Sequence, residues 1–216
     1  MNKNFLYIAI ILFISLFLPR FTYSVNEAKE DNKGGVESFE DFAREKRLGF
    51  DQKERDSIHI TRQRLIKAIE MGNLENIKKF IHDNGTDLNF TTVQDGTNPF
   101  VHASAINKIE LVKFFSSEVG VKIDVTDAFG NTALMKASEK GHVEIAEYLI
   151  NNGSDVNFQN KEGITPLMVA AEKNNFYVFK LLLDKNADTS KSDYTGRTIK
   201  EIAENSRDKR ILKLLN

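Results

Sequence analysis

Residues 130–159 read GNTALMKASEKGHVEIAEYLINNGSDVNFQ, and this stretch decides the fold. Gly130 permits a tight turn with positive φ, and Thr132 can cap the helix that follows by accepting a backbone N–H bond. Gly141 closes that helix and turns the chain. The apolar segment IAEYLI then forms a second helix that ends at Gly153. The stretch therefore predicts two short helices joined by a turn, with a hairpin leading into the next unit.

The same unit recurs along the chain with a period of 33 or 34 residues. Turn glycines stand at Gly96, Gly130, Gly163 and Gly196. Two positions after each glycine comes Asn98, Thr132, Thr165 or Thr198, and seven positions after it comes Ala103, Ala137, Ala170 or Ala203. Three independent columns keep one rhythm, and self-similarity at a fixed period is the signature of stacked repeats.

The segments 130–159 and 163–190 closely resemble the ankyrin repeat. The family's pattern is G-x-T-P-L, then A-A, then G-H, then a leucine-rich helix and G-A-D-V-N, and the second segment reads GITPLMVAAEKNNFYVFKLLLDKNADTS. The resemblance covers roughly residues 60–216. It implies an all-α repeat solenoid, an ankyrin-repeat stack of helix–turn–helix units with β-hairpin loops. We expect about five repeats, with atypical units at both ends: 60–92, 93–126, 127–159, 160–192 and 193–216.

Some positions depart from the family pattern. One extra residue precedes Gly120, and another lies between Gly85 and Gly96. The histidine usual after T-P-L is replaced by Val101, Met135 and Met168. These departures predict a stack that is locally loosened.

The N-terminal residues are predicted to be a targeting segment that precedes the folded domain. Residues 1–24 have Lys3, then an apolar run of 14 residues, then small residues before Val25, which is the layout of a secretory signal peptide. An uncleaved anchor is the alternative. Residues 25–36 read as a flexible polar leader. Residues 37–59 read as an N-terminal helical cap or linker, with a separate docking peptide for a partner as the alternative.

Composition and motifs exclude several classes of function. The 216 residues carry a net charge of −1 and no basic excess, so no nucleic-acid partner is expected. Cysteine is absent, which excludes disulfides, thiolate metal sites and cysteine nucleophiles. The four histidines have no metal-binding spacing, and no phosphate loop or nucleophile motif occurs. We expect no catalytic residue, no cofactor and no metal.

The resemblance implies that partners dock on a concave surface made by hairpin tips and first helices. The candidate partner-binding residues at those positions are Asp95, Ile106, Phe129, Asn131, Glu139, Lys140, Lys161, Glu162, Ile164, Glu172, Lys173, Tyr194 and Arg197. Phe129, Tyr194 and Ile106 stand out, because large apolar groups there should face solvent, and exposed aromatics near arginine are typical of binding hot spots. The alternative is that each folds onto its neighbouring hairpin. Phe90 and Phe158 are expected to pack.

The function that follows is non-catalytic protein binding. The signal segment and the repeats together predict an exported bacterial adaptor or scaffold, periplasmic or secreted, monomeric, with no membrane contact in its mature form. Two alternatives remain within the binding class: a secreted effector that binds a host protein, and a periplasmic accessory factor for an enzyme such as catalase. An enzyme is the least favoured reading.

Overall fold

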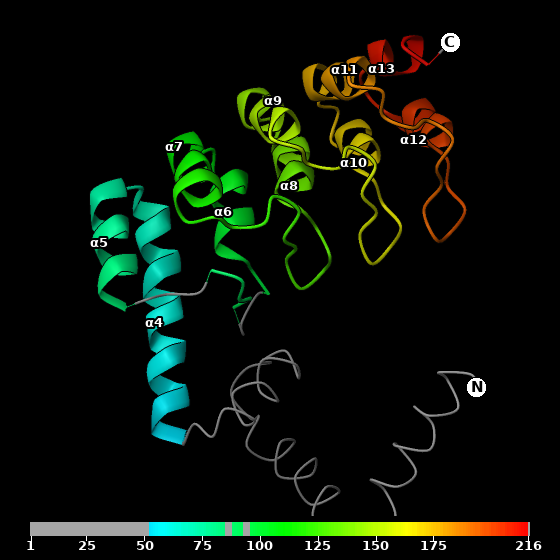
Figure 1. Ribbon diagram of the computed structural model, residues 1–216. Helices are drawn as coiled ribbons and strands as arrows, with labels where there is room; N and C mark the ends of the chain where they lie inside the picture. The colour runs from blue at the N-terminus through cyan, green and yellow to red at the C-terminus, as the bar shows by residue number, and fades with distance from the viewer. Residues whose placement is uncertain (1–51, 85–87, 93–95, 216) are drawn as a thin grey trace, which may run out of the picture.

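The computed structural model describes residues 52–84, 88–92 and 96–215, which form a row of helix pairs (Figure 1). The predicted signal segment 1–24 and leader 25–36 lie outside these described residues. Most of the expected cap or linker also lies outside them.

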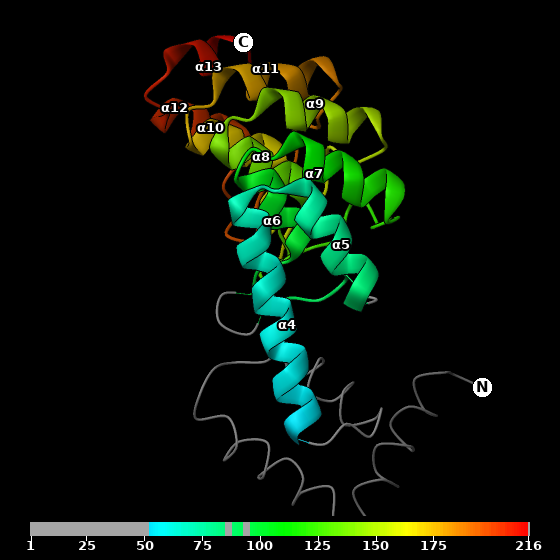
Figure 2. The same cartoon turned by 90° about the vertical axis from the view of Figure 1, so that its left-hand side faces the viewer.

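Each repeat contributes one helix to each of two layers, which Figures 1 and 2 show from two sides. The first helices of the pairs, here called the inner helices, are α4 (Gln52–Met71), α6 (Pro99–Ala105), α8 (Ala133–Lys140), α10 (Pro166–Glu172) and α12 (Ile199–Asn205). The outer helices are α5 (Leu74–Asn84), α7 (Ile109–Lys113) with its continuation η1 (Phe114–Glu118), α9 (Val143–Asn151), α11 (Phe176–Asp184) and α13 (Lys209–Lys213). Inner helices pack on inner helices and outer on outer, so the predicted all-α repeat stack is confirmed.

The inner helices α8, α10 and α12 begin where the sequence predicts. The hydroxyls of Thr132 and Thr165 accept bonds from the N–H groups three residues later, and Thr198 forms a reciprocal capping box with Glu201. The alanine column is fully buried, with 0% exposure at Ala103, Ala137, Ala170 and Ala203. A small side chain at this position lets neighbouring inner helices approach closely.

The turns between inner and outer helices adopt the left-handed conformation that the sequence predicts. Gly141 has φ 76°, and asparagine takes the same role at Asn107 (φ 60°) and Asn174 (φ 61°). Asparagine tolerates this conformation because its short polar side chain can form local hydrogen bonds. The column of Gly and Asn residues therefore ends the inner helix and starts the turn toward the outer one.

The described loops between repeats are hairpins without strand ladders. Within the described ranges the structure has no β-strand, and only two isolated bridges occur, Thr126 with Thr132 and Ser192 with Thr198. Polar side chains at the tips close these loops.

The extra residue before Gly120 is absorbed inside an outer helix. After Lys113 the α-helical pattern of α7 gives way to the π-helical turn η1, in which the Val119 N–H donates to the Phe114 carbonyl at 3.1 Å, five residues back. A π-helical turn accommodates one additional residue without breaking the helix. The repeat spacing of 34 residues here therefore leaves the packing of the flanking repeats intact, with Phe115 fully buried.

The first pair is the least regular. Helix α4 has 20 residues and begins at Gln52, so the expected boundary between residues 59 and 60 lies inside it. Both views show α4 extending beyond the other inner helices (Figures 1 and 2). Phe90, in the segment that leads to the second repeat, is 2% exposed with the Arg62 guanidinium 5.0 Å from its ring centroid. The expectation that Phe90 packs is confirmed, and Phe158 is partly buried.

Candidate protein-binding face

Three tip loops, 127–132, 160–165 and 193–198, are each closed by the side chain of their first residue. The Asp127 Oδ1 accepts bonds from the N–H groups of Phe129 (2.9 Å) and Asn131 (2.8 Å). Asn160 and Asp193 accept from the same two positions of their own loops. Such bonds fix a turn without a strand ladder. The tips are thus held in place by their own sequence.

Neighbouring tips are also bonded to each other. The Lys161 N–H donates to the Phe129 carbonyl at 3.3 Å, and the Tyr194 N–H donates to the Glu162 carbonyl at 3.0 Å. The Lys161 ammonium donates to the Ala128 carbonyl at 2.7 Å. The three loops therefore form one continuous row. Together with the exposed sides of α8, α10 and α12, this row is here called the inner face.

The last tip is the most strongly bonded of the three. Asp193 is buried, and it accepts from the Thr195 hydroxyl at 2.6 Å and from Arg197 Nε at 2.7 Å. The Thr195 hydroxyl, followed by the Arg197 bonds, holds the pKa of the Asp193 carboxyl well below its usual range. Arg197 also reaches across to Glu172 of the preceding repeat, with 3.0 Å between Nη1 and Oε1. Arg197 thus links two repeats on the inner face.

Two of the predicted anchor residues are exposed at the tips. Phe129 is 60% exposed and Tyr194 is 72% exposed. Tyr194 also lies against the preceding tip, because a Cβ added at Gly163 would be 2.6 Å from its ring carbon Cδ1. Its ring therefore rests on the neighbouring hairpin and still presents most of its surface to solvent.

Other predicted residues have different surroundings. Ile106 was expected to face solvent, but it is half-buried at the end of α6 and packs against the core, as does Ile164.

The Asn131 side chain donates to Asp127 (3.1 Å) and accepts from Asn160 (2.8 Å), so its polar groups are used within the tip row. Asp95 lies outside the described residues. Glu162 is exposed.

The charged residues of α8 pair mainly within their own helix, although Lys136 also lies 3.8 Å from Asp127 of the tip loop. Glu139 lies 2.9 Å from the Lys140 ammonium and 3.3 Å from that of Lys136. Partial burial opposes ionisation of Glu139, but the bond from Lys140 and the charge of Lys136 outweigh it and lower its pKa. One repeat later Val169 replaces Lys136, and Glu172 is paired by Arg197 from the next loop instead. Lys173 is exposed.

The comparison with known proteins agrees with this geometry. A family model described as ankyrin repeats in three copies matches residues 65–160 and 147–216. The two matches together cover well over half of the chain. The chain belongs to the ankyrin-repeat family.

Three relatives each match less than half of this chain. The chain is 29% identical over 99 residues to rat ankyrin repeat and SAM domain-containing protein 6, a match that covers 46% of this chain and 11% of that protein. It is 34% identical over 103 residues to Caenorhabditis elegans ankyrin repeat and KH domain-containing protein mask-1, covering 46% and 4% respectively. It is 30% identical over 87 residues to mouse serine/threonine-protein kinase TNNI3K, covering 40% and 10%. The chain thus spans only a small part of these relatives.

Ankyrin repeats are protein-interaction units, and the family is generally non-catalytic. The chain is therefore a protein–protein interaction module. None of the helices in the described residues combines the length and apolarity needed to cross a membrane.

The histidine of the ankyrin G-H turn joins adjacent repeats. One ring nitrogen of His142, Nε2, lies 3.1 Å from the Ala105 carbonyl at the end of the preceding inner helix. At the same position of the next repeat, Asn175 donates to the carbonyls of Ser138 (2.7 Å) and Glu139 (2.9 Å). These bonds satisfy carbonyls that a helix end leaves without partners. The role of His142 is therefore structural.

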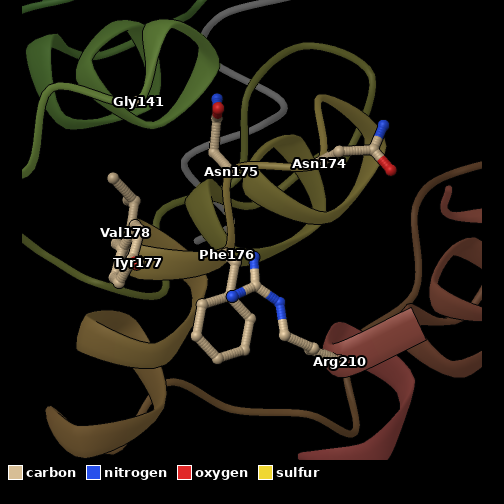
Figure 3. A pocket seen from close by; sticks show the side chains of 7 residues that line it. All are labelled: Gly141, Asn174, Asn175, Phe176, Tyr177, Val178 and Arg210. Carbon is tan, nitrogen blue, oxygen red and sulfur yellow. The ribbon is translucent and has the colours of Figure 1, made fainter. Parts of the chain in front are cut away.

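A second candidate surface lies at the start of α11, where Figure 3 shows the Arg210 side chain beside Phe176. The Arg210 guanidinium lies 4.1 Å from the ring centroid of Phe176 and forms a bidentate pair with Asp208, with 2.7 Å between Nη2 and Oδ2. Tyr177 beside it is 68% exposed. Phe176, Tyr177 and Arg210 border a cavity of about 150 Å³ that reaches Gly141.

Sequence reasoning missed this outer surface. One signal was present: Tyr177 occupies the column that holds Glu75, Glu110 and Glu144 in the earlier repeats and Arg210 in the last one. An aromatic residue in a column of charged residues departs from the repeat pattern. Such a departure indicates that the side chain either packs against a neighbour or binds a partner.

Proposed function

We propose that this ankyrin-repeat chain is a non-catalytic adaptor that binds a protein partner through the inner face. The observation that carries the proposal is the pair of exposed aromatics, Phe129 and Tyr194, on a row of tips that is otherwise bonded internally. Large aromatic side chains on a rigid base contribute most of the energy at protein interfaces, because little conformational freedom is lost when they are covered.

The outer surface at Tyr177 serves as the matched control. Tyr177 is about as exposed as Tyr194 but lies on an outer helix, away from the tip row. A photo-crosslinking phenylalanine analogue placed at 129 or 194 should capture one partner protein, and the same analogue at 177 should not. Equal capture at all three positions would contradict binding through the inner face.

Truncation of the two anchors should then weaken the complex. Phe129→Ala combined with Tyr194→Ala should raise the Kd at least tenfold, since each hot-spot residue contributes roughly 2 kcal/mol. Tyr177→Ala should leave the Kd unchanged. The far-ultraviolet circular dichroism of all three proteins should match. An unchanged Kd for the double variant would remove the proposal's main support.

We further propose that the adaptor works after export from a bacterial cell. The support is residues 1–24, with their basic start, apolar run and small residues before Val25. Fractionation of expressing cells should place the protein in the periplasm or the medium, with Val25 as its new N-terminus. Retention of Met1 in the cytoplasmic fraction would contradict export.

The same fractionation separates the variants of this role. Recovery from the medium or from host cells favours an effector, and recovery from the periplasm favours an envelope adaptor. Loss of peroxide resistance on deletion would favour an accessory role for an enzyme such as catalase.

A further inference from the structure

A pocket of about 190 Å³ lies on the inner face between the C-terminal end of α10 and helix α12. It is lined by Glu172, Arg197, Glu201, Ile202, Asn205 and Ser206. Small-molecule sites usually have about 300–1,000 Å³. The pocket is therefore sized for one long side chain rather than for a free ligand.

Hydrogen-bond acceptors are in excess in this pocket. Glu172 uses Oε1 in its pair with Arg197, and Glu201 uses Oε2 to accept from the Thr198 N–H (2.8 Å) and hydroxyl (3.0 Å). In the part of the chain that the structure describes, the second carboxylate oxygen of each glutamate forms no hydrogen bond or ion pair. The Asn205 amide nitrogen donates to the Glu201 carbonyl, which leaves the Asn205 oxygen as a further acceptor.

The charges around the pocket do not balance. Arg197 pairs with Glu172 and Asp193, and Glu201 also lines the pocket, so these four residues carry an excess of two negative charges. The bonds from Thr198 lower the pKa of Glu201, so this carboxyl is ionised at neutral pH.

The equivalent groove one repeat earlier, between α8 and α10, has no acidic excess. Asn160, Ile164 and Met168 stand there in place of Asp193, Arg197 and Glu201. Glu139, the equivalent of Glu172, is paired with both Lys136 and Lys140. The imbalance is therefore specific to the last two repeats and does not belong to the repeat pattern as such.

We propose that the pocket between α10 and α12 receives a lysine or arginine side chain of the partner protein. The ammonium or guanidinium donates to the second carboxylate oxygens of Glu172 and Glu201, and the aliphatic stem lies along Ile202. The inference rests on the proposed function and names the chemistry of the partner: a basic residue next to apolar residues that cover Phe129 and Tyr194.

Titration of the full chain with N-acetyl-arginine amide, followed by ¹⁵N–¹H NMR, tests the pocket without the partner. The side-chain amide of Asn205 and the backbone amides of Ile202 and Ser206 should shift. N-acetyl-citrulline amide has the same shape without the charge, and it should bind at least tenfold more weakly. Equal shifts with both probes, or shifts confined to other residues, would overturn the proposal.

Two glutamine variants complete the test. Glu201→Gln keeps the capping acceptor for Thr198 and should weaken the arginine probe at least threefold. Glu139→Gln, in the groove between α8 and α10, should leave it unchanged. If both variants bind as the wild type does, the pocket is not the site. If the partner depends on Phe129 and Tyr194 but not on Glu201, this inference fails and the proposed function stands. If no partner is captured, the proposed function fails while the titration still reports on the pocket.

Discussion

The tip loop at Gly163 and the last tip loop at Gly196 have similar backbones in different surroundings. Their φ angles are 78° and 89°. A Cβ added at Gly163 would lie 2.8 Å from the backbone nitrogen of Tyr194 and 2.6 Å from its ring, whereas a Cβ at Gly196 would meet no atom of the described residues within 4 Å. Glycine is therefore favoured for two reasons at position 163, the positive φ and the close approach of Tyr194. At position 196 only the positive φ favours it.

Each tip glycine meets a requirement of its own turn, and some also meet a requirement that the following repeat imposes. The positive φ is a requirement of the turn itself, so it is present at every tip glycine. The close approach belongs to the following hairpin, and Gly130 shows it too, with 2.9 Å between an added Cβ and the Lys161 nitrogen. Where the next hairpin packs against the turn, it therefore excludes a Cβ that the turn alone would only disfavour.

The largest expected effect is that of Gly163→Ala. The added methyl group must displace backbone as well as accept a left-handed φ, so we expect a loss of about 3 kcal/mol in the free energy of unfolding. Gly196→Ala has only the backbone strain and should lose about 1 kcal/mol. Urea unfolding of both variants measures the difference. Equal losses would show that the next hairpin imposes no constraint.

A second experiment concerns how the last repeat is held at its other end. The Asn174 side-chain oxygen accepts from the N–H groups of Arg207 (2.6 Å) and Asp208 (3.0 Å) and from the Ser206 hydroxyl (2.8 Å). Asn107 has the same φ but makes no side-chain hydrogen bond with the described residues.

Asn174→Gly keeps the turn and removes these three bonds, together with the bond that the Asn174 amide donates to the Glu172 carbonyl (3.3 Å). We expect a loss of about 2 kcal/mol, concentrated in the last repeat, so hydrogen exchange should become faster in α12 and α13 before the rest of the stack. Asn107→Gly should change stability by less than about 0.5 kcal/mol. Uniformly faster exchange along the chain would contradict a separate role for the last repeat.

The features that could be predicted from the sequence are those fixed by neighbours along the chain. Capping by Thr132 and Thr165, the turn at Gly141 and the buried alanines follow from backbone geometry and the repeat period. The same period located the tips where Phe129 and Tyr194 are exposed. Local rules and the repeat period agree in this fold, which is why its class could be read directly.

The features that were missed depend on contacts between segments. The half-buried position of Ile106, the stacking of Arg210 on Phe176 and the pairing of Glu172 by Arg197 are set by how one repeat meets the next. The repeat spacing reveals the extra residue before Gly120. It does not predict whether a loop or a π-helical turn accommodates that residue. Tertiary packing decides these points.

The smallest effect concerns acid stability at the last tip. Asn160 and Asp193 close equivalent loops, one as a neutral amide and one as a carboxylate. The folded-state pKa of Asp193 is lowered from 3.8, so its ionised form stabilises the fold above that pH, and this contribution is lost as the pH falls through the folded-state pKa.

Asp193→Asn copies the arrangement at Asn160, since an amide oxygen can accept the same backbone bonds. At pH 7 we expect a loss of about 1 kcal/mol, from the weaker bond to Arg197. Below pH 4 the variant should lose stability less steeply than the wild type, because one carboxylate with a lowered pKa has been removed. Urea midpoints measured from pH 7 down to pH 2 give the two slopes. Parallel slopes would mean that ionisation of Asp193 contributes nothing to the stability of the fold. The carboxylate would then close its loop only as the neutral amide of Asn160 closes the equivalent one.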